Sequence, residues 1–374
     1  MEIGVGTGGS GLDSGTLIAL GRLDEADERL RAELWAADEA GDGTARSLAL
    51  EGLGVVATRR GRDAGAIALF EQSLAVAGEP PSPSQRLTLY WELARSYAVT
   101  GRADQAVALL ERTLERLDSS EATSPAVLEL TLALAHAQID LGAYGRAEST
   151  LVGAMRSSEG AGGEGRTRAR VEYTLARLYA STGRGDQALA YAQRAVDTWG
   201  SVGEEWHLAG SHMLLAHVLL DAGEGDAADH HLHEARRCYG SGLTTADDGF
   251  LRVEEARLAL QRGDLEAAAQ EARTAIERLA GTSSPGEVGD ASLVLARALE
   301  GVGESDAAER AYAAAIDSLT RQNGWRCELG RAYRWYGKFL KRQGRTEAAL
   351  ESLERAADLA DPTSDDGSDV RSRP

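Results

Sequence analysis

Apolar and polar residues alternate along this chain with the spacing of amphipathic helices, and a glycine interrupts the pattern at regular intervals. A glycine followed five residues later by an alanine recurs nine times at regular spacing. Each of these turn glycines lies 40 or 41 residues from the next: Gly21, Gly61, Gly101, Gly142, Gly183, Gly223, Gly263, Gly303 and Gly344. Glycine can end a helix in a left-handed conformation without steric cost. Each unit is therefore predicted to be a helix, a glycine turn and a second helix.

A second set of small residues supports the same periodicity. Seven residues before each of the last eight turn glycines stands an alanine or a glycine: Gly54, Ala94, Ala135, Ala176, Ala216, Ala256, Ala296 and Gly337. Small side chains at these points let paired helices approach closely, while Leu and Tyr fill the grooves between them. The pattern predicts an all-α solenoid of antiparallel helix pairs with about 40 residues per repeat.

The segment YWELARSY (90–97), with Gly101 and Ala106 after it, resembles the tetratricopeptide repeat (TPR) signature, and EYTLARLY (172–179) repeats it. The resemblance implies a right-handed superhelix whose first helices line a concave groove. The unit is longer than the usual repeat of about 34 residues, and the surplus follows the second helix. HEAT repeats have a similar period, but the register of small residues favours the tetratricopeptide interpretation.

The C-terminal part, including 324–360, is similar to the TPR region of actinobacterial helix-turn-helix regulators, in which a DNA-binding domain precedes the repeats. Here we expect a flexible Gly-rich leader over 1–15 and a solenoid of one partial and eight full repeats over 16–360. A disordered tail is expected over 361–374. The leader contains GVGTGG (4–9), which fits G-x-G-x-x-G, but no strand precedes it as a dinucleotide-binding loop requires.

Composition narrows the classes of function. Of the 374 residues, 59 are acidic and 40 basic, and a net charge of −19 argues against direct nucleic-acid or membrane binding. Cys238 and Cys327 lie 89 residues apart without disulfide-framework spacing. The first residues lack the basic region and the continuous apolar run that are typical of a signal peptide, so none is expected. We therefore expect a cytoplasmic protein. The oligomeric state stays open.

Basic residues recur at one position of the repeat, six residues before the turn glycine, where the tetratricopeptide arrangement would face them into the groove. This basic ladder comprises Arg95, His136, Arg177, His217, Arg257, Arg297 and Lys338. One helical turn earlier the residues are largely apolar and include Trp91, Tyr173 and Met213. Arginine binds carboxylates with two parallel hydrogen bonds, and aromatic rings supply stacking area. Together these ten residues are the candidate site for an acidic partner segment.

A structural interpretation of the ladder is equally open, because arginines on helices often pair with acids of a neighbouring helix. Asp140 and Asp221 are candidate internal partners. Charging of His136 and His217 near pH 6 would instead tighten an acidic ligand. Both interpretations can hold for different rungs.

The remaining chemistry is sparse. His230 and His233, with Asp226 or Asp229, have zinc-ligand chemistry, but no second ligand pair accompanies them, so a solvated helix face is favoured. The chain has no G-x-S-x-G, H-E-x-x-H or P-loop motif, and we expect neither catalysis nor a cofactor. The main hypothesis is a regulatory scaffold that binds a protein or peptide. The alternatives are the sensing part of a transcriptional regulator and, third, an enzyme with a site around His230 and His233.

Overall fold

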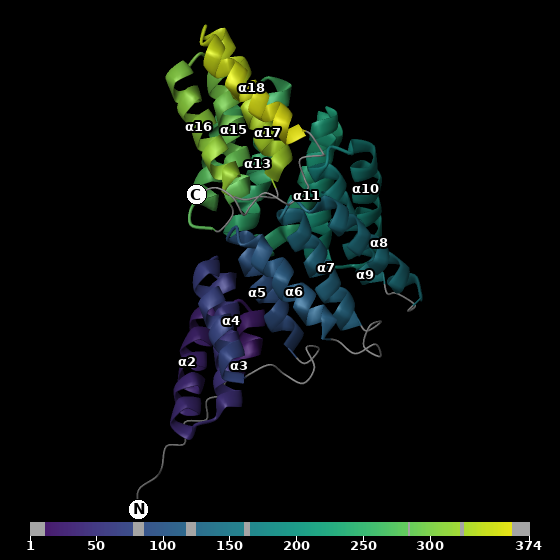
Figure 1. Ribbon diagram of the computed structural model, residues 1–374, viewed down its shortest axis with the longest axis vertical. Coiled ribbons are helices and arrows are strands. Elements are labelled where there is room, and N and C mark those ends of the chain that lie inside the picture. The colour runs from purple at the N-terminus through teal and green to yellow at the C-terminus, as the bar shows by residue number, and fades with distance from the viewer. Residues whose placement is uncertain are drawn as a thin grey trace, which may run out of the picture.

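The computed structural model describes residues 12–77, 86–116, 125–160, 165–282, 285–321 and 325–360, and within these ranges the chain is helical without a strand (Figure 1). The helices are α1 (Ser14–Ala19), α2 (Leu23–Ala40), α3 (Gly43–Arg59), α4 (Asp63–Ala77), α5 (Leu87–Val99), α6 (Ala103–Glu115), α7 (Pro125–Asp140), α8 (Tyr144–Gly160), α9 (Gly165–Ser181), α10 (Gly185–Val202), α11 (Glu205–Ala222), α12 (Gly225–Tyr239), α13 (Thr245–Arg262), α14 (Leu265–Leu279), α15 (Pro285–Gly301), α16 (Ser305–Thr320), α17 (Arg326–Arg342) and α18 (Thr346–Ala360). A short 3₁₀ turn, η2 (Gly240–Gly242), follows α12. The expected tail, and the leader up to residue 11, lie outside the described residues.

Each turn glycine joins the two helices of one pair, as the sequence predicts. All nine have φ between 69° and 87°, which is the left-handed region. At Gly101 the backbone N–H donates to the carbonyl of Ala98 (3.0 Å), and the N–H of Arg102 donates to Tyr97 (2.8 Å). These bonds satisfy carbonyls at the end of α5 that have no partner within the helix. The chain can then reverse into α6.

The alanines five residues after the turn glycines fill the contact between paired helices. All nine are buried: Ala26, Ala66, Ala106, Ala147, Ala188, Ala228, Ala268, Ala308 and Ala349. The small residues of the first helices are buried from Ala94 to Ala296 as well. At Gly54 an added Cβ would lie 2.4 Å from the ring of Phe70. Small side chains are therefore needed where the helices cross.

The pairs stack into a right-handed superhelical solenoid. In Figure 1 the helices from α2 to α6 form the lower part, those from α13 to α18 form the upper part, and α7 to α11 join them along one side. The superhelix turns far enough to bring distant repeats together. Arg331 Nη2 on α17 lies 3.0 Å from Asp221 Oδ2 on α11. An added Cβ on Gly101 would lie 2.9 Å from the carbonyl oxygen of Arg321. The inner helices consequently surround a partly open space.

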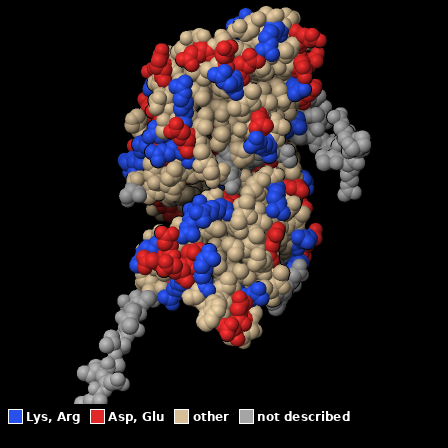
Figure 2. Space-filling model, turned by 90° about the vertical axis from the view of Figure 1, so that its left-hand side faces the viewer, with Lys and Arg blue, Asp and Glu red and all other residues tan. Residues whose placement is uncertain are grey.

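Acidic and basic side chains are interspersed over the face of the molecule shown in Figure 2. Within the described ranges, none of the helices combines the length and apolar character needed to cross a membrane.

Candidate functional site

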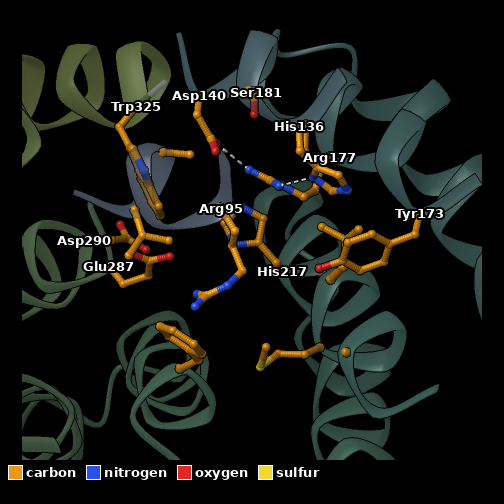
Figure 3. A pocket seen from close by; sticks show the side chains of 18 of the residues that line it. Arg95, His136, Asp140, Tyr173, Arg177, Ser181, His217, Glu287, Asp290 and Trp325 are labelled. Carbon is orange, nitrogen blue, oxygen red and sulfur yellow. Dashed lines mark hydrogen bonds and ion pairs between the residues drawn. The ribbon is translucent and has the colours of Figure 1, made fainter. Parts of the chain in front are cut away.

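A cavity of about 480 Å³ lies inside the superhelix and is lined by the inner helices α5, α7, α9, α11, α13, α15 and α17. Seven of the ten predicted site residues line it: Trp91, Arg95, His136, Tyr173, Arg177, Met213 and His217 (Figure 3). Arg257, Arg297 and Lys338 are not among its lining residues.

The helical repeat explains why these side chains point inwards. Ala94, Ala135, Ala176 and Ala216 are buried against neighbouring helices. The next residue is rotated by about 100° around the helix axis and therefore faces the inside of the superhelix. Trp91, Tyr173 and Met213 precede the ladder by four residues and lie on the same helix face.

Two ladder arginines form ion pairs with the acids that the sequence suggested. Arg177 Nη2 lies 2.8 Å from Asp140 Oδ1. Arg257 pairs with Asp221 and also with Glu254, whose Oε2 lies 2.9 Å from Arg257 Nη1. In each case the arginine of one repeat reaches back to an acid near the turn of the preceding repeat. The structural interpretation therefore holds for these two rungs.

Arg95 is paired in the same way but is more open. Its guanidinium lies 2.9 Å from Asp63 Oδ1 and 3.2 Å from Glu92 Oε2. About a third of the Arg95 side chain is exposed, at 34%, whereas Arg257 is mostly covered. Arg95 thus keeps donors on the cavity side for a ligand.

His136 is neutral. Arg177 Nη1 can only donate, so His136 Nδ1 accepts its hydrogen bond (2.6 Å), and Nε2–H donates to the Thr174 hydroxyl (3.0 Å). Burial, and then the charge of Arg177, lower the pKa of His136 well below its ordinary range. The expectation that His136 gains charge near pH 6 is therefore wrong.

His217 has the opposite environment. Burial disfavours its charged form, but the neighbouring Glu254 outweighs that effect and raises the pKa of His217. Its Nδ1 lies 2.8 Å from Glu254 Oε1. The pKa values of the two histidines of the cavity wall are therefore shifted in opposite directions although they occupy equivalent repeat positions.

The last two rungs of the ladder contact an aromatic ring instead of the cavity. The guanidinium of Arg297 lies 3.9 Å from the centroid of Trp335, and Nζ of Lys338 lies 4.5 Å from it. Cation–π contacts of this kind stabilise the end of the repeat stack.

Sequence reasoning missed four carboxylates that line the same cavity: Glu254 on α13, Glu287 and Asp290 on α15, and Glu328 on α17. Asp290 is 4% and Glu328 7% exposed. Burial raises the pKa of Glu287 to about 7, although Arg177 acts in the other direction. A signal was available, because Glu287 and Glu328 both stand sixteen residues before a turn glycine.

Aromatic side chains complete the wall. Figure 3 shows Trp325 beside Glu287 and Asp290, with Tyr173 on the opposite side and its hydroxyl pointing into the cavity. Trp325 packs so closely on Gly286 that an added Cβ would lie 2.1 Å from the indole ring. The cavity therefore combines a carboxylate wall, a cationic wall and aromatic surface.

The histidine-rich helix α12 lies apart from the cavity lining. His233 is 77% exposed and contacts Asp229 (3.2 Å), and the ring of His230 lies 5.2 Å from that of His231. In the part of the chain that the structure describes, no three or more His, Cys, Asp or Glu residues are grouped to hold a metal ion.

Comparisons with known proteins agree with the repeat architecture. A family model described as the MalT-like TPR region matches residues 80–364, and one described as a tetratricopeptide repeat matches residues 49–84. No curated protein matches the chain in sequence.

Solved structures of low sequence identity share the fold. A Rap protein complexed with competence and sporulation factor is 13% identical with a TM-score of 0.57, and covers 84% of this chain and 97% of its own. The Cut9–Hcn1 hetero-tetramer of APC/C matches at 13% identity and a TM-score of 0.58, covering 92% of this chain and 72% of its own. A tetratricopeptide repeat protein from Parabacteroides merdae is 18% identical with a TM-score of 0.52, covering 76% and 96%.

Proposed function

The chain belongs to the MalT-like tetratricopeptide repeat family, and we propose that it is a regulatory, non-enzymatic protein that binds a peptide segment in the cavity inside its superhelix. The observation that carries this proposal is the convergence of seven inner helices on one cavity lined by charged and aromatic side chains. A volume of about 480 Å³ is in the range of ligand sites. In the similar Rap structure, the TPR protein is in complex with a second molecule, competence and sporulation factor.

The proposed contacts divide the ten predicted residues into groups. Trp91, Tyr173 and Met213 supply surface for side chains of the peptide. The Tyr173 hydroxyl, which bonds to no other residue in the described ranges, supplies a hydrogen bond. Arg95 binds an acidic group of the partner, because its Nη1 forms no hydrogen bond with another described residue, whereas both Nη atoms of Arg177 are bonded. Arg177 and Arg257 act indirectly by holding neighbouring repeats in register.

A second candidate function is the sensing part of a transcriptional regulator. The match to a MalT-like region and the likeness of 324–360 to regulator repeats favour it. Both functions use the same cavity. In the first, peptide binding is itself the regulatory step, and in the second, binding in the cavity controls transcription. The free thiols of Cys238 and Cys327 suit the reducing cytoplasm that we propose for either.

Filling the cavity tests the proposal. Gly210 lines the cavity from α11, and an added Cβ there meets nothing within 4 Å, so Gly210→Leu places a side chain in the open space. Gly153→Leu is the matched control, because Gly153 is also helical and open but lies on the outer helix α8. Both variants should fold at least as well as the wild type, because leucine favours helix over glycine by about 0.8 kcal/mol.

The measurement is selection of a random linear peptide library on immobilised protein, followed by calorimetry with the enriched peptides. We expect the wild type and Gly153→Leu to retain the same peptides and Gly210→Leu to lose them. Failure to enrich any peptide, or equal retention by Gly210→Leu, would overturn the proposal.

A further inference from the structure

We propose that the carboxylate wall formed by Glu287, Asp290 and Glu328 is a subsite for an organic cation, namely the amino terminus or a Lys or Arg side chain of the bound peptide. This inference rests on the proposed function and specifies the chemistry at one side of the cavity. It adds a positive group to the acidic group assigned to Arg95, so the ligand carries both charges.

The first argument is that the carboxylates are buried without a partner. Asp290 and Glu328 are 4% and 7% exposed. Neither side chain forms an ion pair or hydrogen bond with another residue of the described ranges, yet both line the cavity. The only fully buried side-chain nitrogen and oxygen atoms without a partner in the described residues belong to Arg86, so the oxygens of Asp290 and Glu328 contact the open space of the cavity. A largely buried carboxylate without a partner still costs free energy. A cation bound in the cavity supplies the missing partner.

The second argument is that the nearby cations are already engaged. Arg177 interacts electrostatically with Glu287, but its guanidinium forms an ion pair with Asp140 (2.8 Å). Arg331 interacts electrostatically with Asp290 and Glu328, but its guanidinium contacts Asp221 (3.0 Å).

Two further basic side chains interact with the wall. Arg257 pairs with Asp221 and Glu254. His217 bonds to Glu254 (2.8 Å). The internal charges therefore leave the three carboxylates of the wall underpaired. Burial accordingly raises the pKa values of Glu287 and Glu328.

The third argument is the aromatic surface beside the carboxylates. Trp325 lies next to Glu287 and Asp290 (Figure 3), and Phe250 also lines the cavity. Ammonium and guanidinium groups bind favourably where carboxylates and aromatic faces meet. The three carboxylates are spread along one wall of the cavity. In the described ranges no group of three or more His, Cys, Asp or Glu residues is arranged to hold a metal ion, and this includes the wall. This arrangement suits a Lys or Arg side chain.

The probe for the subsite alone is N-acetyl-arginine amide, and N-acetyl-citrulline amide is its neutral isostere. Binding is followed by calorimetry and by the fluorescence of the cavity tryptophans Trp91 and Trp325. The test variant is Asp290→Asn/Glu328→Gln. The control variant Asp104→Asn/Glu354→Gln changes the same groups at exposed positions outside the cavity.

We expect the wild type and the control variant to bind the arginine compound about tenfold or more tightly than the citrulline compound, because only the charged guanidinium forms charge-assisted hydrogen bonds with the carboxylates. The test variant should lose this preference while its melting temperature does not fall. Equal binding of the two compounds by the wild type, or an undiminished preference in the test variant, overturns the subsite.

Peptides enriched on the wild type separate this inference from the proposed function. Their affinity should fall about tenfold or more when the contacting amine is acetylated, or when Lys is replaced by norleucine or Arg by citrulline. The group whose neutralisation causes the loss identifies whether the amino terminus or a side chain is held. Peptides that bind in the cavity regardless of these changes overturn the subsite and leave the proposed function standing. Selective binding of the arginine compound without any peptide ligand supports the subsite and overturns the proposed function.

Discussion

Asp221 on α11 forms an ion pair with Arg331 on α17, although 110 residues separate them in sequence (3.0 Å). Because α11 and α17 belong to repeats three apart, this contact spans the superhelix and does not simply join adjacent pairs. It links two helices that both line the cavity. The shape of the cavity therefore depends on long-range contacts as well as on stacking of neighbours.

Replacing Arg331 by methionine should loosen the superhelix and lower its stability. The pair with Asp221 is partly exposed, but Arg331 also interacts electrostatically with the buried Asp290 and Glu328, so its removal should cost about 3 kcal/mol. Asp221 keeps Arg257 as a partner in this variant. We expect a larger radius of gyration by small-angle scattering. Arg342→Met, which removes a pair between adjacent repeats with Glu300, is the control, and an unchanged radius for Arg331→Met would contradict the closure role.

The turn glycines should respond differently from glycines within helices. Gly263 has φ 79°, so Gly263→Ala forces an L-residue into the left-handed region and should destabilise the protein by about 1–2 kcal/mol. Gly153 lies within α8 with open space around its Cβ position, so Gly153→Ala should stabilise the protein by about 1 kcal/mol. Thermal denaturation followed by circular dichroism measures both. Shifts of the same sign would show that the repeat glycine has no special backbone role.

These glycines also show why the fold was predictable and the cavity was less so. The positions of Gly263, its equivalents and the buried alanines recur every 40 or 41 residues, so one sequence contains nine copies of the same packing rule. The inward direction of Arg95 and Tyr173 follows from the same register.

The position of the carboxylate wall was less predictable, because it depends on the curvature of the superhelix and not on the pattern within one repeat. Asp290 and Glu328 belong to different repeats and meet the cavity only because the superhelix curves through a large angle. Curvature accumulates from small rotations between repeats, which no local sequence pattern specifies. For the same reason the sequence left open whether Arg177 binds a ligand or Asp140, because the distance between Arg177 and Asp140 depends on how two neighbouring repeats pack.

Glu287→Gln should remove a pH dependence of stability between about pH 4.5 and 7. The pKa of Glu287 is raised from 4.5 to about 7, with Arg177, Asp140 and Asp290 as the charged groups facing it. The folded state thus binds this proton more tightly than the unfolded state. Its contribution to stability is full below pH 4.5 and is lost as the pH rises through 7, by at most about 1.4 kcal/mol per pH unit.

Melting temperatures of the wild type and Glu287→Gln across this pH range measure the effect. The variant should gain stability relative to the wild type as the pH rises. Glu347→Gln, at an exposed position on α18, is the control. Parallel curves for Glu287→Gln and the wild type would show that Glu287 does not titrate in this range.

The pKa values of the two cavity histidines should be shifted in opposite directions from their ordinary value of 6.5. Burial and Arg177 keep His136 neutral as the pH falls, so its contribution to stability is present above pH 6.5 and lost at low pH. Glu254 raises the pKa of His217, so its contribution is present below pH 6.5 and lost as the pH rises through its elevated value. Nitrogen-15 spectra of the imidazoles should show His136 protonated at Nε2 alone. A His136 that charges near pH 6 would contradict the assigned hydrogen bonds.

Glu328→Gln and Glu254→Gln should change stability in opposite directions although both residues are equally buried, at 7% and 8% exposed. Glu254 forms close contacts with Arg257 and His217, and removing a partner from a buried pair costs about 3 kcal/mol. Glu328 has no such partner among the described residues, so a neutral amide of the same shape should stabilise the protein by about 1 kcal/mol. Melting temperatures at pH 8 distinguish the two cases. A loss of stability in Glu328→Gln comparable to that in Glu254→Gln would mean that Glu328 is held by an internal cation, and would remove the main reason to place a ligand cation beside it.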